Sequence, residues 1–545
     1  MAANRACFLG NVTDGPWGRN VPTESVAFDE AGITSRLLCL ESPCYAVCDG
    51  TQVGLSHHAG VDSSAPSGGH RLKPVAWVPP LPIWQLGDPA FRETHGTHYA
   101  YHAGAMANGI ASEQMVIALG KEGFLASFGA AGLTPARLEE AIVCIQKALP
   151  QGPYAFNLIH SPGEPALESR CVDLYLSHAV SCVEAAAYLD LTPFVVRYRV
   201  AGLRLRGRDE VHAANRLIAK VSRREVAAKF MEPAPQRILK QLLEQKLITE
   251  QQAALSQRVP MADDITVEAD SAGHTDNRPM FALLPSIAAL RDEIQQKYRY
   301  AQPLRVGAGG GIGTPSAALA TFMMGAAYVV TGSINQSCIE ARTSGHCKKL
   351  LAEADVADVT MAPAADMFEM GVKLQVLKRG TLFPMRAQKL YELYMQYNSL
   401  EEIPLKEREK LEKQIFRSSL ESIWESTQAY FSELDPGQIE KGAKNPKKKM
   451  ALVFRWYLGL SSHWSIVGEP GREMDYQIWC GPSMGSFNAW VRKSCLEDVS
   501  HRKVADVARH ILTGAAFFYR VQSLKAQGVV LSPACSEYRL EPIES

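Results

Sequence analysis

The sequence predicts an α/β fold in which eight parallel strands close into a TIM (β/α)8 barrel. From about residue 97 to residue 333, short apolar segments of strand length alternate with longer segments of helical periodicity. We expect strands at residues 99–105, 124–128, 154–158, 182–185, 217–221, 265–268, 304–306 and 328–330. Helices are expected between them at residues 112–121, 134–148, 167–178, 223–230, 284–297 and 315–324. Eight strands over about 240 residues fit one closed barrel better than an open sheet.

The segments on either side of the barrel differ from it in composition. Residues 1–75 contain short apolar runs broken by Gly, Ser and Pro, which predicts a small β-rich N-terminal module with a linker at SSAPSGG. We assign residues 76–335 to the barrel, including a helical insertion near residues 232–258. Residues 336–480 have helical periodicity and predict a helical cap, in which NPKKK is expected to be an exposed basic turn. Residues 481–545 are expected to be helical and to pack back on the barrel.

The composition disfavours several classes of function. Lys plus Arg equals Asp plus Glu, 57 against 57, so no overall charge favours nucleic acid or an anionic membrane. The 12 cysteines include no C-x-x-C pair, and Cys39, Cys44 and Cys48 lack a fourth ligand at zinc-site spacing. The N-terminus has no continuous apolar stretch of the kind found in signal peptides. We therefore expect reduced thiols, no metal, no membrane segment and a cytoplasmic location.

A glycine-rich loop follows the seventh expected strand. Residues 303–325 read PLRVGAGGGIGTPSAALATFMMG, and Thr314 is placed to cap a helix that begins at Pro315. Glycines let the backbone approach an anion closely, and the loops after strands seven and eight are where barrels bind phosphate. Gly332 and Ser333 form a second turn after the eighth strand. The glycines do not match G-x-G-x-x-G, so the pattern favours a flavin phosphate over a dinucleotide.

A histidine follows the sixth expected strand. Within ITVEADSAGHTDNRP, Glu268 ends the strand and a turn through Gly273 presents His274 at the barrel mouth. A histidine there can act as a general acid or hold a carbonyl group by a hydrogen bond, and we expect Asp276 to fix its tautomer. The acidic neighbours leave a metal site as an alternative, which the lack of a second histidine in the segment disfavours. A purely structural histidine is the other alternative.

Other strand ends supply candidate supporting groups. Ala105 and Met106 follow the first strand, where small residues would let a flat ring lie against the backbone. Asn157 lies near the end of the third strand, where an amide can both donate and accept hydrogen bonds. Lys220, near the end of the fifth strand, would reach a ring carbonyl or a phosphate, or else it is an ordinary surface lysine with a buried stem.

These motifs resemble those of known flavoenzymes. EADSAGHTDNRP resembles the E-A-G-G-H turn of nitronate monooxygenases and of FMN-dependent enoyl-acyl-carrier-protein reductases, and GAGGGIG with TGS resembles their FMN-phosphate loops. Together with AGAMANGIASEQMVIALGKEGFLASFGAAGL, VSRREVAAKFMEPAP and DYQIWCGPSMGSFNAW, they resemble the PfaD-type trans-acting enoyl reductases of polyunsaturated fatty acid and trans-acyltransferase polyketide synthases. The matching segments span residues 103–490, which is most of the chain.

The resemblance implies an FMN-bearing barrel that takes hydride from NADPH. It would reduce the α,β-double bond of an enoyl thioester carried by the acyl carrier protein of a polyketide or fatty acid synthase. His274 would be the catalytic residue, either as proton donor or as the group that holds the thioester. The implied cofactor contacts are Ala105, Met106, Asn157, Lys220, Glu268, Gly273, Gly309, Gly310, Gly311, Thr331, Gly332 and Ser333.

The resemblance has one departure and leaves other functions open. Ala272 stands where the relatives commonly have a second glycine before the histidine, which puts the geometry of that turn in question. The cap is expected to cover the barrel mouth, with Trp479, Cys480 and Pro482 lining an acyl channel. A flavoenzyme that oxidises nitronates, or a non-catalytic subunit that docks carrier proteins, would share the barrel. A homodimer also stays open.

Overall fold

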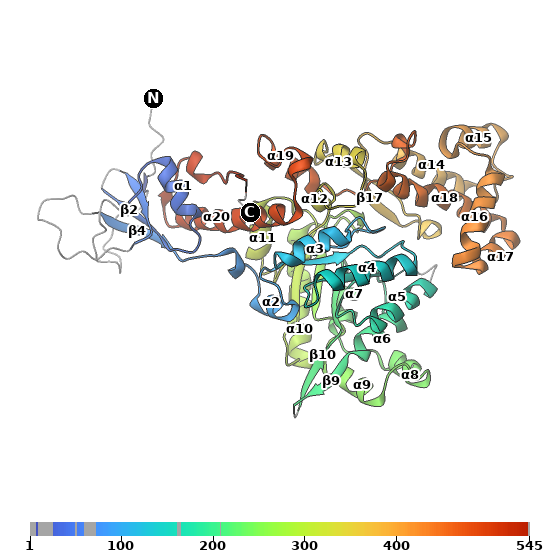
Figure 1. Cartoon of the computed structure of the whole chain (residues 1–545), viewed down its shortest axis with the longest axis horizontal. Coiled ribbons are helices and arrows are strands. Elements are labelled where there is room, and N and C mark those ends of the chain that lie inside the picture. The colour runs from blue at the N-terminus through green and yellow to red at the C-terminus, as the bar shows by residue number, and fades with distance from the viewer. Residues whose placement is uncertain are drawn as a thin grey trace, which may run out of the picture.

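The computed structural model describes residues 7–8, 26–49, 52–58, 72–160, 165–207 and 209–542. An N-terminal module and a mainly helical cap lie at opposite ends of the long axis, with the barrel between them (Figure 1). The linker predicted at SSAPSGG lies outside the described residues.

The predicted barrel is confirmed. Eight strands close in the order β11-β12-β14-β15-β5-β6-β7-β8, and every neighbouring pair is parallel. All eight expected strands are present, with ends that differ by a few residues. They are β5 (Tyr101–Ala103), β6 (Leu125–Phe128), β7 (Ala155–Ile159), β8 (Cys182–Ala186), β11 (Arg216–Val221), β12 (Asp264–Glu268), β14 (Arg305–Gly309) and β15 (Val329–Thr331).

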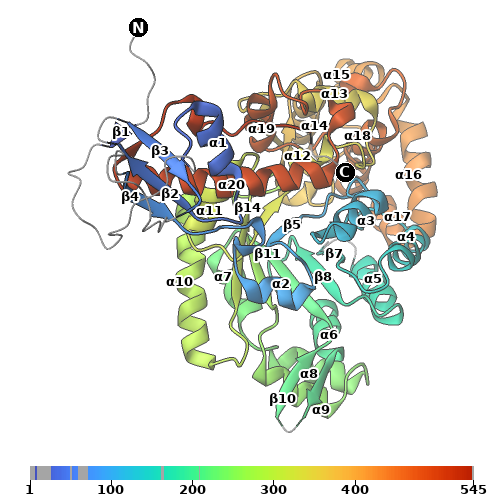
Figure 2. The ribbon, with the colours of Figure 1, turned by 60° about the vertical axis from the view of Figure 1, so that its left-hand side comes forward.

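Helices surround the barrel, and all six expected ones are present (Figure 2). They are α3 (Glu113–Lys121), α4 (Pro135–Ala148), α5 (Pro165–Ser177), α7 (Arg224–Met231), α10 (Met280–Tyr298) and α11 (Pro315–Met323). The insertion forms α8 (Gln236–Glu244) and α9 (Glu250–Leu255).

The sequence reading missed one barrel helix and a hairpin. The helix is α6 (Pro193–Ala201), and β9 (Leu203–Arg206) pairs with β10 (Glu210–Ala213) directly after it. The α6 sequence PFVVRYRVA is rich in β-branched and aromatic residues, which resembles a strand more than an amphipathic helix. The Thr192 side chain accepts a hydrogen bond from the Val195 N–H, which caps the helix, and the packed barrel wall decides the rest.

The N-terminal module and the C-terminal helix pack together. Strands β3 (Val53–Ser56), β2 (Cys44–Cys48) and β4 (Lys73–Val78) form an antiparallel sheet, and α1 (Glu30–Leu38) precedes them. The long helix α20 (Val504–Ala526) runs from this sheet across α11 of the barrel (Figure 2). Its Arg520 is fully buried and donates to the carbonyl oxygens of Cys39 at 2.9 Å and Leu40 at 2.8 Å. These bonds fix the module to α20, which in turn packs on α11 of the barrel.

The cap is mainly helical, as expected, but it contains two strands that the sequence reading missed. Strands β16 (Val359–Pro363) and β17 (Lys373–Leu377) pair with each other, and β17 also pairs with β13 (Gly273–His274). The helices of the cap are α13 (Gly345–Ala352), α14 (Phe383–Gln396), α15 (Leu405–Lys410), α16 (Leu420–Leu434), α17 (Pro436–Lys444) and α18 (Pro446–Val467). The short helix α12 (Ser333–Gln336) precedes the cap, and α19 (Ser483–Val491) follows it. The strand pairing therefore connects the cap to the turn that carries His274.

The turn predicted at NPKKK is wrong, because these residues begin α18. Asn445 caps the helix by accepting from the backbone N–H of Lys447 and of Lys448. The Lys447 ammonium donates to the carbonyl oxygens of Tyr394 and Tyr397, and Lys448 pairs with Glu369. The Lys449 ammonium lies over the Trp424 ring, so all three lysines are engaged within the cap.

A buried ion cluster closes the bottom of the barrel, at the N-terminal ends of the strands. The Asp264 carboxylate has no exposed surface, and it accepts from Arg305 at 2.6 and 2.9 Å and from His95 at 2.8 Å. His95 ends α2 (Pro89–His95), which packs beneath the barrel. Burial acts to raise the pKa of Asp264, but Arg305 and His95 outweigh it and hold that pKa well below its ordinary value. The carboxylate is therefore ionised and connects β12, β14 and α2.

Replacing Asp264 by Asn should destabilise the fold. The Arg305 guanidinium would stay buried without its counter-charge, and breaking a buried pair costs about 3–5 kcal/mol. The midpoint of denaturant unfolding measures this loss. Asp173→Asn removes an exposed pair with Arg197 and should cost less than about 1 kcal/mol. Equal effects of the two substitutions would contradict the role assigned to Asp264.

Candidate active site

A cavity of about 920 Å³ lies between the barrel mouth and the cap. Its volume is that of a site for a cofactor or a substrate of moderate size. The predicted site residues that line it are Ala105, Met106, Asn157, Lys220, Glu268, Gly273, His274, Gly309, Gly310, Thr331, Gly332 and Ser333. Gly311 is the one predicted cofactor contact that does not line the cavity. The barrel has therefore brought together strand ends that are far apart in the sequence.

The glycine loop after β14 has a backbone that requires glycine. Gly310 has a φ of +96°, and a Cβ added there would lie 2.8 Å from the carbonyl carbon of Ala269. Gly311 has a φ of +77°. Thr314 caps α11 as predicted, since its hydroxyl accepts from the Ala317 N–H. The loop therefore presents bare backbone to the cavity and leads into a capped helix.

The second predicted turn, after β15, is open on the cavity side. No atom lies within 4 Å of the position that a Cβ of Gly332 would take. The Ser333 hydroxyl is almost fully buried, and its oxygen accepts from the Gly481 N–H at 2.9 Å. The turn can therefore offer backbone groups and the Ser333 hydroxyl hydrogen to an anion, while the Ser333 oxygen is already bound.

His274 pairs with a carboxylate that the sequence reading missed. Its Nε2 lies 3.1 Å from Oδ1 of Asp366, a cap residue that follows β16. Asp276 does not fill this role as predicted, because its carboxylate binds Ser222 at 2.6 Å and Arg223 at 2.9 Å. Asp366 is 92 residues from His274, and no local pattern connects the two. Only the folding of the cap onto the barrel forms the pair.

The environment of His274 favours its protonated form. Burial acts to lower the pKa of His274, but the Asp366 carboxylate, helped by Glu268, outweighs burial and Lys220 and raises it above the ordinary 6.5. Ala272 does not strain the turn before His274. Gly273 adopts the left-handed conformation, with a φ of +73°, and Ala272 does not. The turn thus has its glycine where the backbone needs one.

A buried charge network lies beside the histidine. The Lys220 ammonium is 3.2 Å from Oε1 of Glu268 and 3.9 Å from Oε1 of Glu184. Burial acts to lower the pKa of Lys220, and the two carboxylates outweigh it and raise that pKa. Glu184 was not predicted as a site residue, although a lone acid in the apolar strand CVEAA was a signal that could have identified it.

Two predicted residues already bind to Glu184. The Ala105 N–H donates to its Oε2 at 3.0 Å, so this N–H is not available to a ligand. The Asn157 amide nitrogen donates to the Glu184 carbonyl oxygen at 3.1 Å. Both residues line the cavity, and their hydrogen bonds to Glu184 fix their orientation.

The cap side of the cavity differs from the prediction. Trp479 lines it, whereas Cys480 and Pro482 do not. Cys480 has no exposed surface, and burial raises the pKa of its thiol well above the ordinary value, which argues against a nucleophile. The apolar lining of the cap comes instead from α16 and α18, and includes Tyr430, Phe431, Leu452, Trp456, Leu460 and Ile466.

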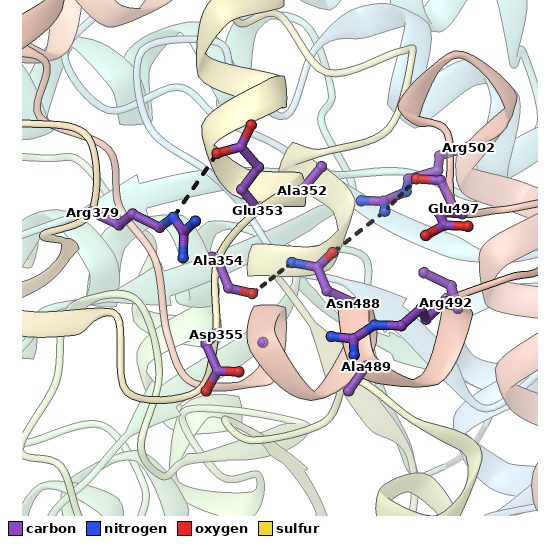
Figure 3. A pocket seen from close by; sticks show the side chains of 12 residues that line it. Ala352, Glu353, Ala354, Asp355, Arg379, Asn488, Ala489, Arg492, Glu497 and Arg502 are labelled. Atoms are coloured by element: carbon purple, nitrogen blue, oxygen red, sulfur yellow. Dashed lines mark hydrogen bonds and ion pairs between the residues drawn. The ribbon is translucent and has the colours of Figure 1, made fainter.

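A smaller pocket of about 330 Å³ lies between α13 and α19 (Figure 3). Arg379 is paired there with Glu353 and with Asp358 outside the pocket. Arg502 is buried and donates to the Ser337 hydroxyl and to two main-chain carbonyl oxygens. These cations are satisfied within the protein, and we assign no ligand to this pocket.

The fold and the cavity define an α/β-barrel protein with a glycine-rich loop and a histidine–carboxylate pair at its mouth. The family model for the N-terminal domain of fatty acid synthase subunit PfaD matches residues 20–80. The model for the inserted helical domain of [acyl-carrier-protein] S-malonyltransferase matches residues 397–476, within the cap. The enoyl reductase domain of MlnA, from the macrolactin biosynthesis cluster of Bacillus amyloliquefaciens, matches with a TM-score of 0.78 and 40% identity. That match covers 82% of this chain and 100% of the MlnA domain.

Longer relatives carry the same region. A polyunsaturated fatty acid synthase protein of Thraustochytrium sp. is 46% identical over 92% of this chain, and the match spans 33% of that longer protein. Polyketide biosynthesis protein PksE of Bacillus subtilis is 46% identical over 81% of this chain, and the match spans 57% of PksE. The chain belongs to the PfaD-type enoyl reductase family. In the part of the chain that the structure describes, no helix combines the length and apolar character needed to cross a membrane.

Replacing Asp366 by Asn should lower the pKa of His274. An amide keeps the shape of the side chain but removes the negative charge that stabilises the imidazolium. We expect the wild-type pKa to lie above 6.5, and the Asp366→Asn pKa to lie below that of the wild type. NMR titration of protein with labelled histidine rings measures both, with His274→Gln identifying the signal. Asp276→Asn is the matched control and should leave the pKa in place. The opposite pattern would make Asp276 the partner of His274.

Proposed function

We propose that the chain is an FMN-dependent, trans-acting enoyl reductase. It uses NADPH to reduce the α,β-double bond of enoyl thioesters on acyl carrier protein, in polyketide or polyunsaturated fatty acid biosynthesis. The observation that carries the proposal is the His274–Asp366 pair in the same cavity as the two glycine turns. The 40% identity to the enoyl reductase domain of MlnA supports the same reaction.

The residues present suit a flavin mononucleotide. Gly332 leaves open space where a side chain would intrude on a phosphate, and Gly310 gives the neighbouring loop a backbone conformation that favours glycine. Backbone N–H groups are the usual phosphate ligands in such loops. Ala105, Met106 and Asn157 would face the ring system, and Lys220 supplies a cation near it. A flavin bound there would supply hydride transfer from NADPH to the substrate.

The chain's own groups would handle charge and protons during the reaction. Hydride addition at the β-carbon of an enoyl thioester places negative charge on the thioester oxygen, and that charge needs a hydrogen-bond donor. His274 Nε2 faces Asp366, which leaves Nδ1–H of the imidazolium to bind this oxygen or to protonate the α-carbon. Because the protonated ring is the active form, the rate falls as the pH rises through the His274 pKa.

The cap would hold the acyl chain and exclude water. Side chains of α16 and α18 cover one side of the cavity, and most of them are apolar. The family model that matches this part of the cap describes a domain inserted in an acyl-carrier-protein transferase. We therefore place the carrier-borne thioester between the cap and the barrel mouth, with the acyl chain against α16 and α18.

Replacing His274 by Ala should abolish reduction and leave flavin binding intact. The imidazole is not needed to cradle a phosphate, whereas general acid catalysis contributes about 10²-fold or more to a rate. The test follows NADPH consumption and the saturated product without oxygen, with a crotonyl thioester as substrate. His178→Ala, outside the cavity, is the control and should keep the wild-type rate. A wild-type rate in the His274 variant would remove this residue from the mechanism. If the wild-type protein shows no turnover in the absence of oxygen, the assignment as an enoyl reductase is rejected.

Replacing Gly332 by Asp should give protein without flavin. This position tests the phosphate cradle more cleanly than Gly310, where any side chain would strain the backbone and press on Ala269. A carboxylate at residue 332 would repel a phosphate, whereas Gly332→Asn adds similar bulk without charge. The absorption spectra of the purified proteins, with the cofactor identified by mass spectrometry, measure the outcome. Equal flavin content in the Asp and Asn variants would reject the assignment of the phosphate site.

A further inference from the structure

Glu184 is a buried acid for which the proposed reaction has no direct use. It lies in the middle of β8 and points into the barrel just below the cavity, with 1% of its surface exposed. Barrel interiors are usually packed with branched apolar side chains. A carboxylate in this position carries a large desolvation cost unless several groups stabilise it. Its contacts therefore indicate why the barrel keeps a charge there.

The two oxygens of the carboxylate contact different parts of the cavity floor. Oε2 accepts from the Ala105 N–H at 3.0 Å, and this bond holds the turn that follows β5. Oε1 lies 3.9 Å from the Lys220 ammonium on β11 and has no hydrogen-bond partner among the described residues. One side chain thus connects the turn after β5 with the lysine of another strand.

Charged and titratable groups from several strands surround Lys220 and Glu184. Glu268 on β12 lies on one side of the ammonium and Glu184 on β8 on the other. His102 on β5 lies 3.5 Å from Glu184, but burial lowers the pKa of this histidine to about 4, so it is neutral at physiological pH. His274 on β13 adds positive charge from the mouth. Against burial, both His102 and Lys220 lower the pKa of Glu184, and Lys220 is the one of the two that lines the cavity.

We infer that Glu184 is a positioning residue, whose carboxylate holds the Lys220 ammonium and the turn through Ala105 in place at the floor of the cavity. The inference rests on the proposed function in one respect, because that function places the flavin ring on this floor. Glu184 would not touch the ring. It would act through Lys220 and through Ala105, both of which line the cavity.

The charge of Glu184 can be tested through the reactivity of Lys220. The full-length chain, dialysed free of flavin, is treated across a pH series with acetic anhydride, which reacts only with the neutral amine. Mass spectrometry then follows the peptide that contains Lys220. In Glu184→Gln the amide still accepts from Ala105, but the charge that favours the ammonium is gone. We expect the midpoint of labelling to move to lower pH, with several-fold faster labelling below the wild-type midpoint.

Two further variants separate this effect from a loss of stability. Glu268→Gln removes the nearer carboxylate and should move the midpoint in the same direction. Asp264→Asn removes a buried carboxylate from the other end of the barrel and should lower the unfolding midpoint without moving the labelling midpoint. Identical labelling midpoints in the wild type and Glu184→Gln would overturn the inference. Because the labelling needs no cofactor, a wild-type protein that never binds flavin would reject the proposed function and leave this result standing.

Discussion

The candidate site depends on a short antiparallel pairing between the barrel and the cap. Gly273 pairs with Gln375 and His274 with Leu374, which places the histidine turn in the same sheet as the cap strands. The Gln375 side chain is buried and donates at 2.8 Å to both Asp270 and the Ser271 carbonyl oxygen. This pairing brings Asp366 to the imidazole and closes the cavity over the barrel mouth. Without this pairing, His274 would lack the strand that holds its turn against the cap.

The barrel handles buried charge differently at its two ends. At the bottom, Asp264 is bound on both oxygens by Arg305 and His95, so the cluster is saturated and contributes to stability. At the top, two carboxylates share the Lys220 ammonium, and one oxygen of Glu184 lacks a hydrogen-bond partner among the described residues. Incomplete satisfaction of buried polar groups is costly and is typical of functional sites. The contrast agrees with chemistry placed at the C-terminal ends of barrel strands.

Much of the barrel could be read from the sequence, and less of the cap. Barrel strands are short apolar runs separated by capped helices, so local pattern is enough to locate them. The α6 segment was missed because its residues favour a strand. Strand β17 was missed as well, and one of its two partners, β13, lies far away in the sequence. For the site, turn chemistry located His274 and the two glycine turns. Turn chemistry could not identify Asp366, because its pairing with His274 joins residues that are 92 positions apart in the sequence.

Elements with local causes follow from short stretches of the sequence. Glycine at Gly310 and Gly273, which adopt positive φ, and the threonine cap at Thr314 are each set by one residue and its neighbours. The pairing of charges, in contrast, depends on the folded arrangement of distant segments. Asp366 instead of Asp276 binds His274, and Glu184 joins Lys220, because a closed barrel and a folded cap bring distant strand ends within 4 Å. Electrostatic pairing depends on distance in space, which sequence separation does not report.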